Sequence, residues 1–246
     1  PIPSRGLGDV YKRQVESMTR VKTGFDPLPY PYSDEEKQNP HLYLSMGITA
    51  ENVAKKYNIS RTEQQQFSLE SHRKAIEAQQ KEKFKSEITK IGDCETDENI
   101  RPNSTMEKLD SLKLAFDQNG TVTAATSSPL TDGAAATLIC EENFAKENGL
   151  EIFGRIKSIA VEGCDPKFMG LGPISASKKA LNRAKLRIED IDIIELNEAF
   201  ASQSLACIKD LKIDKKKVNL DGGAIALGHP LGCLLYTSPS PRDGIG

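Results

Sequence analysis

The second half of the chain alternates short apolar, β-prone segments with amphipathic helical segments, and this alternation constrains the fold more than any other feature. Strands are predicted over residues 155–161, 193–196 and 218–220, and residues 134–140 fit either a buried strand or a helix. Helices are predicted over residues 141–148, 175–184 and 198–211. Strands that alternate with helices are typical of an α/β protein.

The front of the chain is mainly helical. Residues 49–57 and 61–80 predict helices, and Ser60 and Glu63 have the spacing of a capping box at the start of the longer one. The other elements expected here are a short helix over residues 105–112, a short strand over 88–91 and a β-rich segment over 120–125. We therefore predict an α/β fold with a largely helical insert near its front.

Charge and cysteine content exclude several classes of function. The 246-residue chain has a formal net charge of -2 and no long basic run, which argues against binding to nucleic acid. No stretch approaches the roughly 18 consecutive apolar residues of a membrane span. The five cysteines are not paired at the spacing of metal ligands, and the chain is too long and too charged for a disulfide scaffold. We expect no metal site and a reducing, cytoplasmic location.

The two ends of the sequence are predicted not to be native. Residues 233–243 read Cys-Leu-Leu-Tyr-Thr-Ser-Pro-Ser-Pro-Arg-Asp, and one coding sequence for them can be read on its opposite strand. That reading gives Ser-Arg-Gly-Leu-Gly-Asp-Val-Tyr-Lys-Arg, which is the sequence of residues 4–13. The same DNA sequence, read on opposite strands at the two ends, indicates a translated sequencing adapter. We predict that residues 1–14 and 233–246 are adapter-derived, and that residues 15–232 are an internal piece of a longer protein.

Two polar residues are candidates for chemistry. Residues 221–232 read Asp-Gly-Gly-Ala-Ile-Ala-Leu-Gly-His-Pro-Leu-Gly, and they place His229 between Gly228 and Pro230. Glycine permits a tight backbone and proline fixes the turn, so this stretch predicts a loop that aims one imidazole. An imidazole can transfer protons near neutral pH, although a histidine in a glycine-rich turn can also lack a chemical role. Asn197 follows a predicted strand, where its amide could hold a water or an oxyanion, or could cap the next helix.

Several specific motifs follow one another along the chain: Glu16-Ser17-Met18 and residues 46–52, 120–124, 131–135, 165–170, 197–201 and 222–232. In this order they resemble the motifs of thiolases, and the resemblance covers nearly all of residues 15–232. The sequence is most similar to the 3-ketoacyl-CoA thiolases of bacterial fatty-acid β-oxidation. Thr126-Ser127-Ser128 and residues 196–200 favour that branch over the biosynthetic acetoacetyl-CoA thiolases.

The resemblance implies a fold of two similar βαβαβαββ halves packed in five αβαβα layers, which would be incomplete here. Residues 15–116 would be a mainly helical loop domain that covers CoA, residues 117–150 the end of the first half, and residues 151–232 the start of the second. The implied reaction transfers an acyl group to CoA through a cysteine acyl-enzyme and releases acetyl-CoA. The implied assembly is a homodimer or larger, which can pair with a hydratase/dehydrogenase subunit.

The resemblance also implies roles for individual residues. His229 matches the catalytic histidine, and Asn197 matches the asparagine that holds a catalytic water. Four further residues match CoA-binding positions: Ser128, Met169 and Met46 along the pantetheine arm, and Arg101 near the adenine. For the methionines, core packing is an equally good interpretation. CoA would be a substrate, and no bound cofactor is implied.

The family's two catalytic cysteines match none of the cysteines in this chain. The nucleophile would precede Glu16 and the second cysteine would follow Gly232, so we expect an enzyme as the parent protein and no turnover by this chain. Three alternatives stay open: a biosynthetic acetoacetyl-CoA thiolase, a ketoacyl or hydroxymethylglutaryl-CoA synthase that shares the fold, and a non-catalytic acyl-CoA-binding homologue.

Overall fold

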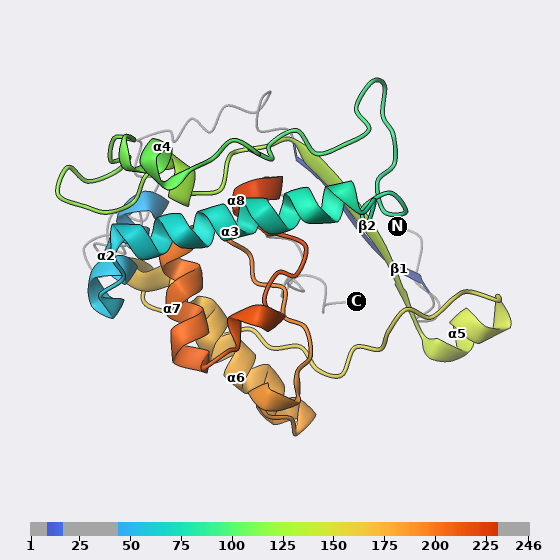
Figure 1. The fold of residues 1–246 in the computed structure, drawn as a ribbon. Helices are drawn as coiled ribbons and strands as arrows, with labels where there is room; N and C mark the ends of the chain where they lie inside the picture. Colours follow the sequence, from blue (N-terminus) through green and yellow to red (C-terminus); the bar gives the residue numbers. More distant parts are fainter. Residues whose placement is uncertain (1–8, 17–43, 231–246) are drawn as a thin grey trace, which may run out of the picture. The chain divides into compact units, whose positions relative to one another are not determined.

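A computed structural model describes residues 9–16 and 44–230, and Figure 1 shows its elements. The described residues fall into two units, each with its own contacts. The smaller unit holds residues 9–16, 130–159 and 230, and the larger unit holds residues 44–129 and 160–229. Residues 17–43 and 231–232 of the predicted native piece lie outside the described residues.

The smaller unit contains a two-stranded antiparallel sheet. Strand β1 (Asp9–Glu16) pairs with β2 (Gly133–Cys140) along its whole length, from Asp9 opposite Cys140 to Glu16 opposite Gly133. The strand interpretation of residues 134–140 is therefore confirmed, but the expectation of burial is wrong, because most side chains of β2 are exposed. β1 includes residues 9–14, whose adapter origin stays a prediction.

Helix α5 (Glu142–Glu147) follows β2 in the smaller unit. The Glu141 carboxylate caps its first turn by accepting hydrogen bonds from the backbone amides of Asn143 and Phe144. Gly149 follows the helix with a φ of 64°, a left-handed conformation that glycine adopts without strain. The helix predicted over residues 141–148 is confirmed, with bounds that differ by one residue at each end.

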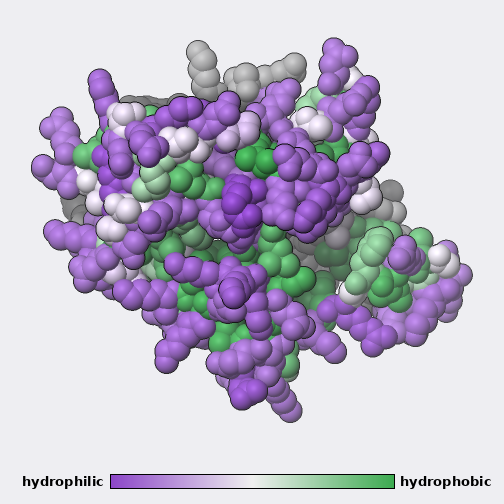
Figure 2. All heavy atoms as spheres, in the orientation of Figure 1, coloured by the Kyte–Doolittle hydropathy of each residue, from purple (hydrophilic) through white to green (hydrophobic). Residues whose placement is uncertain are grey.

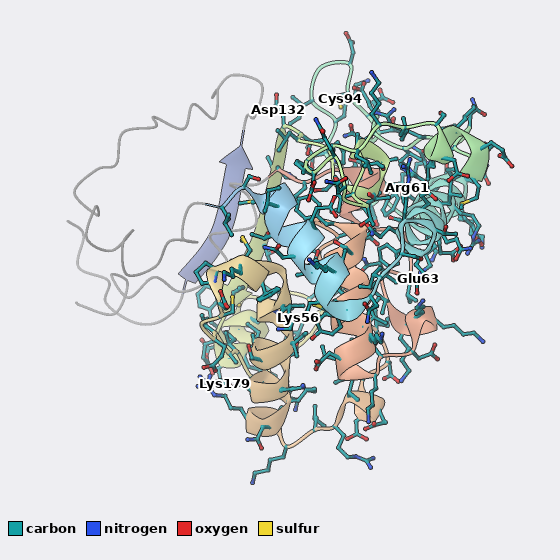
Figure 3. The ribbon with its side chains drawn as sticks, turned by 90° about the vertical axis from the view of Figure 1, so that its left-hand side faces the viewer. Lys56, Arg61, Glu63, Cys94, Asp132 and Lys179 are labelled. Carbon is teal, nitrogen blue, oxygen red and sulfur yellow. The ribbon has the colours of Figure 1, made fainter. Side chains whose placement is uncertain are left out.

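The larger unit is mainly helical. Its α-helices are α2 (Met46–Tyr57), α3 (Arg61–Gln80), α4 (Met106–Asp110), α6 (Gly172–Ala184), α7 (Ala201–Leu211) and α8 (Ala224–Leu227). The 3₁₀ turns are η1 (Ala124–Thr126), η2 (Pro166–Leu171), η3 (Ile188–Asp190) and η4 (Lys215–Lys217). The predicted capping box is present at the start of α3, where Ser60 Oγ accepts from the Glu63 amide and the Glu63 carboxylate accepts from the Ser60 amide. Arg61 then joins α3 to α4 by donating to the carbonyl oxygens of Leu109 and Asp110 (Figure 3).

The core of the larger unit forms around α7, which is buried on almost every face. One apolar cluster joins it to α2 and the turn after it, and consists of Val53, Ile59, Leu205 and Ala206. A second cluster joins it to α6, and consists of Ile174, Cys207 and Leu211. Helix α6 is less deeply buried, since Ile174 is its one buried side chain and Ala176, Ala180 and Leu181 are half-buried. These contacts fix the helices that carry the polar residues described below.

Most of the other predicted strands do not form. Residues 193–196 and 218–220 contribute a single parallel bridge, Ile194 to Val218, and residues 155–161 have no strand pairing among the described residues. The segments 88–91 and 120–125 likewise show isolated bridges rather than strands. The physical reason is that a strand is defined by ladder hydrogen bonds to a neighbour, and these segments find no continuous neighbour in the described part of the chain. Apolar side chains on 155–161 are left exposed, for example Ile156 at 61%.

Figure 2 shows hydrophilic residues over much of one face, with hydrophobic residues visible between them. No helix within residues 44–230 combines the length and the apolar character that crossing a bilayer requires. The described residues also contain no cluster of histidine, cysteine and carboxylate side chains that could hold a metal ion.

Candidate active site

The two predicted catalytic residues lie in contact with each other. Asn197 Nδ2 is 3.2 Å from His229 Nε2, although 32 residues separate them in the sequence. When the amide donates, Nε2 is the acceptor of a neutral imidazole whose proton is on Nδ1. Burial lowers the pKa of His229 below its ordinary value, so the neutral form dominates at pH 7. His229 Nδ1 is buried and has no hydrogen-bond partner among the described residues.

The loop before His229 holds the imidazole in place, as the glycine pattern predicts. Helix α8 ends at Gly228, which has a φ of 107° that a residue with a side chain would rarely adopt. The His229 amide donates to the Pro129 carbonyl oxygen at 3.1 Å, and the side chain is only 7% exposed. The position of His229 is therefore fixed both by its backbone hydrogen bond and by the residues that bury its side chain.

Asn197 stands at the end of the bridged segment that includes Ile194. The Asn219 side chain continues that pairing by accepting from the Leu196 amide and donating to the Leu196 carbonyl, both at 2.8 Å. Gln203 Nε2 donates to the Asn197 carbonyl oxygen at 3.2 Å. The predicted start of the helix at residue 198 is wrong, because α7 begins at Ala201. Asn197 is therefore not the helix cap, and its amide is available for the contact with His229.

Ser128 lies beside the segment that follows Asn197. Its amide and its hydroxyl both donate to the Ala199 carbonyl oxygen, at 3.0 Å and 3.2 Å. Because the hydroxyl proton is used in this way, the oxygen can still accept a hydrogen bond from another group.

Asn197 also lines an apolar cavity of about 180 Å³, together with Met46 and Met169. The other walls come from α2, η2, α6, the segment before α7 and α7 itself: Thr49, Ala50, Gly170, Pro173, Leu196, Ala199, Phe200 and Gln203. Met46 is 45% exposed and Met169 is 43% exposed, so neither packs in the core. Three of the sequence-predicted residues thus meet at one cavity, and a fourth, His229, contacts Asn197.

Arg101 does not line this cavity. It borders a cavity of about 440 Å³ with Lys108 and the residues around α4. It also borders a smaller one of about 140 Å³, whose wall includes Pro129, the residue that binds the His229 amide. The Arg101 amide donates to His72 Nδ1 at 3.3 Å, and burial followed by the Arg101 charge lowers the pKa of His72.

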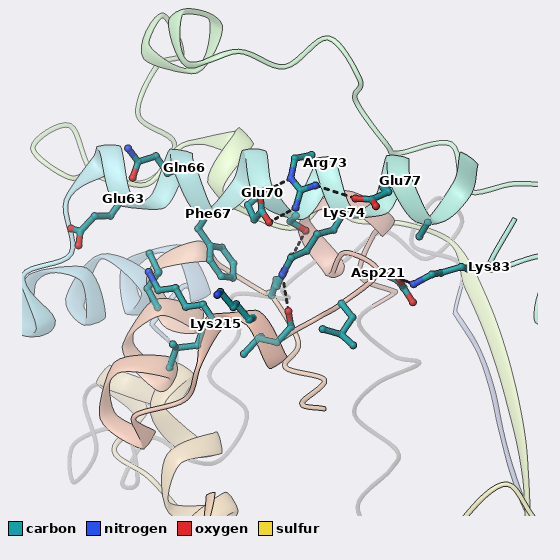
Figure 4. Close-up of a pocket in the computed structure, with 18 of the residues that line it drawn as sticks. Glu63, Gln66, Phe67, Glu70, Arg73, Lys74, Glu77, Lys83, Lys215 and Asp221 are labelled. Carbon is teal, nitrogen blue, oxygen red and sulfur yellow. Dashed lines mark hydrogen bonds and ion pairs between the residues drawn. The ribbon is translucent and has the colours of Figure 1, made fainter. Parts of the chain in front are cut away.

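A larger groove of about 510 Å³ lies along α3, and it is not the predicted site. Figure 4 shows its charged rim, where Arg73 lies between Glu70 and Glu77, and Lys83 faces Asp221. These pairs are solvent-exposed, and such pairs contribute little to stability or specificity. The smaller apolar cavity, with its asparagine and buried histidine, is chemically the better candidate.

Sequence reasoning missed the buried polar residues that support the pair: Ser71, Glu198, Gln203 and Asn219. The partners of Ser71, Glu198 and Asn219 are distant in the sequence, so no local pattern indicates these residues. Gln203 binds nearer residues, Phe200 and Asn197. The one available signal is the position of Glu198 directly after Asn197.

The fold and the site together define an α/β protein with a buried histidine that contacts an asparagine at an apolar cavity. Comparison with known families identifies the class. A thiolase N-terminal domain matches residues 15–143, and a thiolase C-terminal domain matches residues 150–234. The chain belongs to the thiolase family, and its α/β fold is part of the thiolase fold.

Two bacterial relatives of this chain are described as 3-ketoacyl-CoA thiolases. The chain is 50% identical over 244 residues to a 3-ketoacyl-CoA thiolase of Marinobacter nauticus, which covers 93% of this chain and 61% of the relative. It is 54% identical over 202 residues to a 3-ketoacyl-CoA thiolase of Photobacterium profundum, which covers 76% of this chain and 52% of the relative.

Two solved structures are also similar to this one. The dimeric peroxisomal thiolase of Saccharomyces cerevisiae matches with a TM-score of 0.86 and 42% identity, over 92% of this chain and 60% of the yeast chain. Human mitochondrial 3-ketoacyl-CoA thiolase matches with a TM-score of 0.81 and 37% identity, over 92% of this chain and 61% of the human chain. The chain spans about half to three fifths of the length of these relatives.

Proposed function

We propose that the longer protein carrying this sequence is a 3-ketoacyl-CoA thiolase. The single observation that supports this most is the contact between Asn197 and a buried, neutral His229 beside an apolar cavity. A neutral imidazole can take the proton of a cysteine thiol, and the resulting thiolate is the nucleophile. The thiolate attacks the ketone carbon, the bond to the acetyl unit breaks, and the acyl group passes to the sulfur of a second CoA.

Asn197 has a role of its own in this proposal. Bond cleavage leaves an enolate of acetyl-CoA, whose negative charge develops on the thioester oxygen until the α-carbon is protonated. Hydrogen-bond donors fixed in advance stabilise such a charge, because they need no reorganisation. The exposed Asn197 amide, held through Leu196 and Gln203, is such a donor, directly or through a water.

CoA is proposed as the substrate that occupies the cavity. A pantetheine arm is a narrow chain of methylene and amide groups, which suits apolar walls with a few polar contacts. Met46 and Met169 supply partly exposed apolar surface, and the Ser128 oxygen can accept from an amide N–H. Arg101, at a separate cavity, is proposed to contact the nucleotide end. Neither a bound cofactor nor a metal is needed for this chemistry.

The chain by itself is proposed to be inactive, because the family's catalytic cysteines match none of its own and the described cysteines of the larger unit bind groups other than His229. Cys207 donates to the Gly170 carbonyl oxygen, and burial raises the pKa of its thiol to about 12. Cys94 and Cys164 are exposed, and their thiols contact the carbonyl oxygens of Thr96 and Met169 rather than His229. Both catalytic cysteines would lie outside residues 15–232.

The branch and setting of the enzyme are also proposals. The bacterial relatives are described as 3-ketoacyl-CoA thiolases, and we propose that the longer protein acts in the degradative direction, in fatty-acid β-oxidation in the cytoplasm. The yeast relative is described as dimeric, which favours a homodimer or larger assembly. The hydratase/dehydrogenase subunit is a further proposed partner, which only the resemblance to thiolases implies. A biosynthetic acetoacetyl-CoA thiolase and a non-catalytic acyl-CoA-binding protein are the alternatives.

The test uses the extended protein, by which we mean the product of the gene read beyond residues 15 and 232. We expect it to cleave 3-ketoacyl-CoA substrates in the presence of CoA, measured by loss of the ketoacyl-CoA absorbance. His229→Ala should lower kcat by about 100- to 10,000-fold, and Asn197→Ala by about 100- to 1,000-fold. Glu77→Gln, which alters an exposed ion pair on α3, is the matched control and should leave kcat unchanged.

The alternatives give different results in the same assay. Preference for acetoacetyl-CoA over longer substrates would indicate the biosynthetic branch. Tight CoA binding without turnover, in an extended protein that lacks either cysteine, would indicate a binding homologue. Turnover by the 246-residue chain above its own His229→Ala variant would contradict the assignment of the cysteines to residues outside it.

A further inference from the structure

Glu198 follows Asn197 directly, but its side chain points into the protein. The residue is 2% exposed, whereas Asn197 is exposed. Its carboxylate accepts hydrogen bonds from Ser71 Oγ at 2.6 Å, Asn219 Nδ2 at 2.8 Å and the Ile225 amide at 3.2 Å. These donors belong to α3, to the segment after the Ile194–Val218 bridge, and to α8. One carboxylate therefore joins three segments that are far apart in the sequence.

The same contacts extend to both members of the Asn197–His229 pair. Asn219, held by Glu198, binds the amide and carbonyl of Leu196, the residue before Asn197. Ile225 lies in α8, four residues before His229. A single buried group thus fixes the backbone on both sides of the 3.2 Å contact.

Further hydrogen bonds brace this arrangement. Ser71 Oγ, which donates to Glu198, also accepts from the Gly223 amide at 3.0 Å. Lys74 Nζ donates to the Val218 carbonyl oxygen at 2.8 Å, from the same helix (Figure 4). Helix α3 is therefore the rigid element against which the loop before His229 is held.

Glu198 has no place in the reaction itself. It does not line the cavity that holds Asn197, and it contacts neither His229 nor Met169. Burial raises the pKa of its carboxyl group, and the three hydrogen bonds oppose that rise. A buried carboxylate with three donors satisfied is costly to keep and is retained where it fixes a geometry.

We propose that Glu198 is a positioning residue, whose carboxylate sets the distance between Asn197 and His229 by holding Asn219 and α8 against α3. This inference rests on the proposed function of the pair. It adds a residue that acts on the reaction through the geometry of others, without contact with the substrate.

The chemistry of the three donors explains why glutamate is required. A carboxylate offers only acceptors, and each of its oxygens here faces at least one N–H donor. In Glu198→Gln, the amide NH₂ must face either Asn219 Nδ2 or the Ile225 amide, which places two donors together. Asn219 cannot rotate to relieve this, because its Oδ1 already accepts from the Leu196 amide. No orientation of the glutamine amide satisfies the whole set.

Kinetics of the extended protein test the proposal. Glu198→Gln should lower kcat by about 100-fold, the loss expected from a displacement of about 1 Å. KM for the ketoacyl-CoA should stay within about threefold, because Glu198 does not line the cavity. The matched control is Glu195→Gln, which neutralises an exposed carboxylate three residues earlier and should leave both constants unchanged. Glu198→Asp keeps a carboxylate, which only accepts hydrogen bonds, so its kcat should fall less than the kcat of Glu198→Gln.

Nitrogen NMR of the His229 ring in the 246-residue chain gives a readout that does not depend on turnover. Donation from Asn197 to Nε2 favours one neutral tautomer, with the proton on Nδ1. Glu198→Gln should produce a mixture of tautomers, and Glu195→Gln should not. The ring-nitrogen signals that disappear in His229→Gln are those of His229.

Ser71→Ala keeps the proposal testable if Glu198→Gln does not fold. It removes one donor to the carboxylate and the acceptor for the Gly223 amide, and should lower kcat by about tenfold. The proposal is overturned if Glu198→Gln lowers the melting temperature while kcat and the tautomer signal match those of Glu195→Gln. A rise in KM with unchanged kcat would also overturn it. An inactive extended protein refutes the proposed function instead, and the tautomer measurement then still decides the positioning role.

Discussion

Gly222 offers a direct test of how the loop before His229 is held against α3. Its φ is 88°, and a Cβ built on it would lie 2.7 Å from Ala75 Cβ and 2.9 Å from the Ser71 carbonyl oxygen. Two separate costs therefore apply to Gly222→Ala. The left-handed backbone costs about 1–2 kcal/mol for a residue with a side chain. The overlap with helix backbone, which cannot move aside, costs about a further 1–3 kcal/mol.

Two other glycines separate these costs. Gly92 has a similar φ of 59°, but nothing lies within 4 Å of a Cβ there, so Gly92→Ala measures the backbone cost alone. Gly223 has an extended backbone, but its Cβ would lie 2.2 Å from Glu198 Cδ, so Gly223→Ala measures crowding alone. We expect Gly222→Ala to be the most destabilising of the three.

The assay is urea unfolding followed by circular dichroism. With a slope of about 2 kcal/mol per molar urea, an additional cost of about 2 kcal/mol lowers the midpoint by about 1 M relative to Gly92→Ala. Equal midpoints for Gly222→Ala and Gly92→Ala would refute the close contact between this loop and α3. An unchanged midpoint in Gly92→Ala would refute the backbone cost.

Three further results are expected. Stability should fall as the pH drops from about 7 to 5, because burial lowers the pKa of His72 and His229 below 6.5 and the unfolded chain then binds protons first. Each histidine adds at most about 1.4 kcal/mol per pH unit, and an unchanged slope in His72→Gln would contradict this. Iodoacetamide at pH 8 should label exposed Cys94 much faster than Cys207, whose pKa burial raises to about 12, and equal labelling by mass spectrometry would refute that difference. Ser60→Ala should lower the free energy of unfolding in urea by about 1 kcal/mol, and no change would deny the capping box a role.

The helices were predictable because their signals are local. The start of α3 depends on Ser60 and Glu63, which are three residues apart, and the end of α5 depends on Gly149 just after it. Strands were less predictable, because a segment becomes a strand only by pairing with a neighbour that can lie anywhere in the chain. Residues 155–161 have the right alternation and still form no ladder. Their apolar side chains would be covered in a complete sheet.

The candidate site was predictable only in part, and for the same reason. His229 and Asn197 lie in motifs of a few residues, and the resemblance to thiolases assigns them directly. Glu198 is held by residues 127, 21 and 27 positions away, so its role is visible only when the chain is folded. Met46 and Met169 could not be assigned from the sequence, because methionine suits a protein core equally well. Only their exposure in the structure places them at a cavity.

Residues 127–129 explain why the site depends on the front part of the chain as well as on its two motifs. Ser127 bridges Phe200, Ser128 binds the Ala199 carbonyl, and Pro129 accepts from the His229 amide. One tripeptide therefore contacts the Asn197 segment on one side and the His229 loop on the other. Glu198 connects the same two segments through a second set of contacts, which lie on α3 and α8. Because each set of contacts fixes part of the backbone around the pair, loss of the Glu198 set alone is expected to displace Asn197 and His229, and the 3.2 Å distance is a property of the folded unit rather than of either motif.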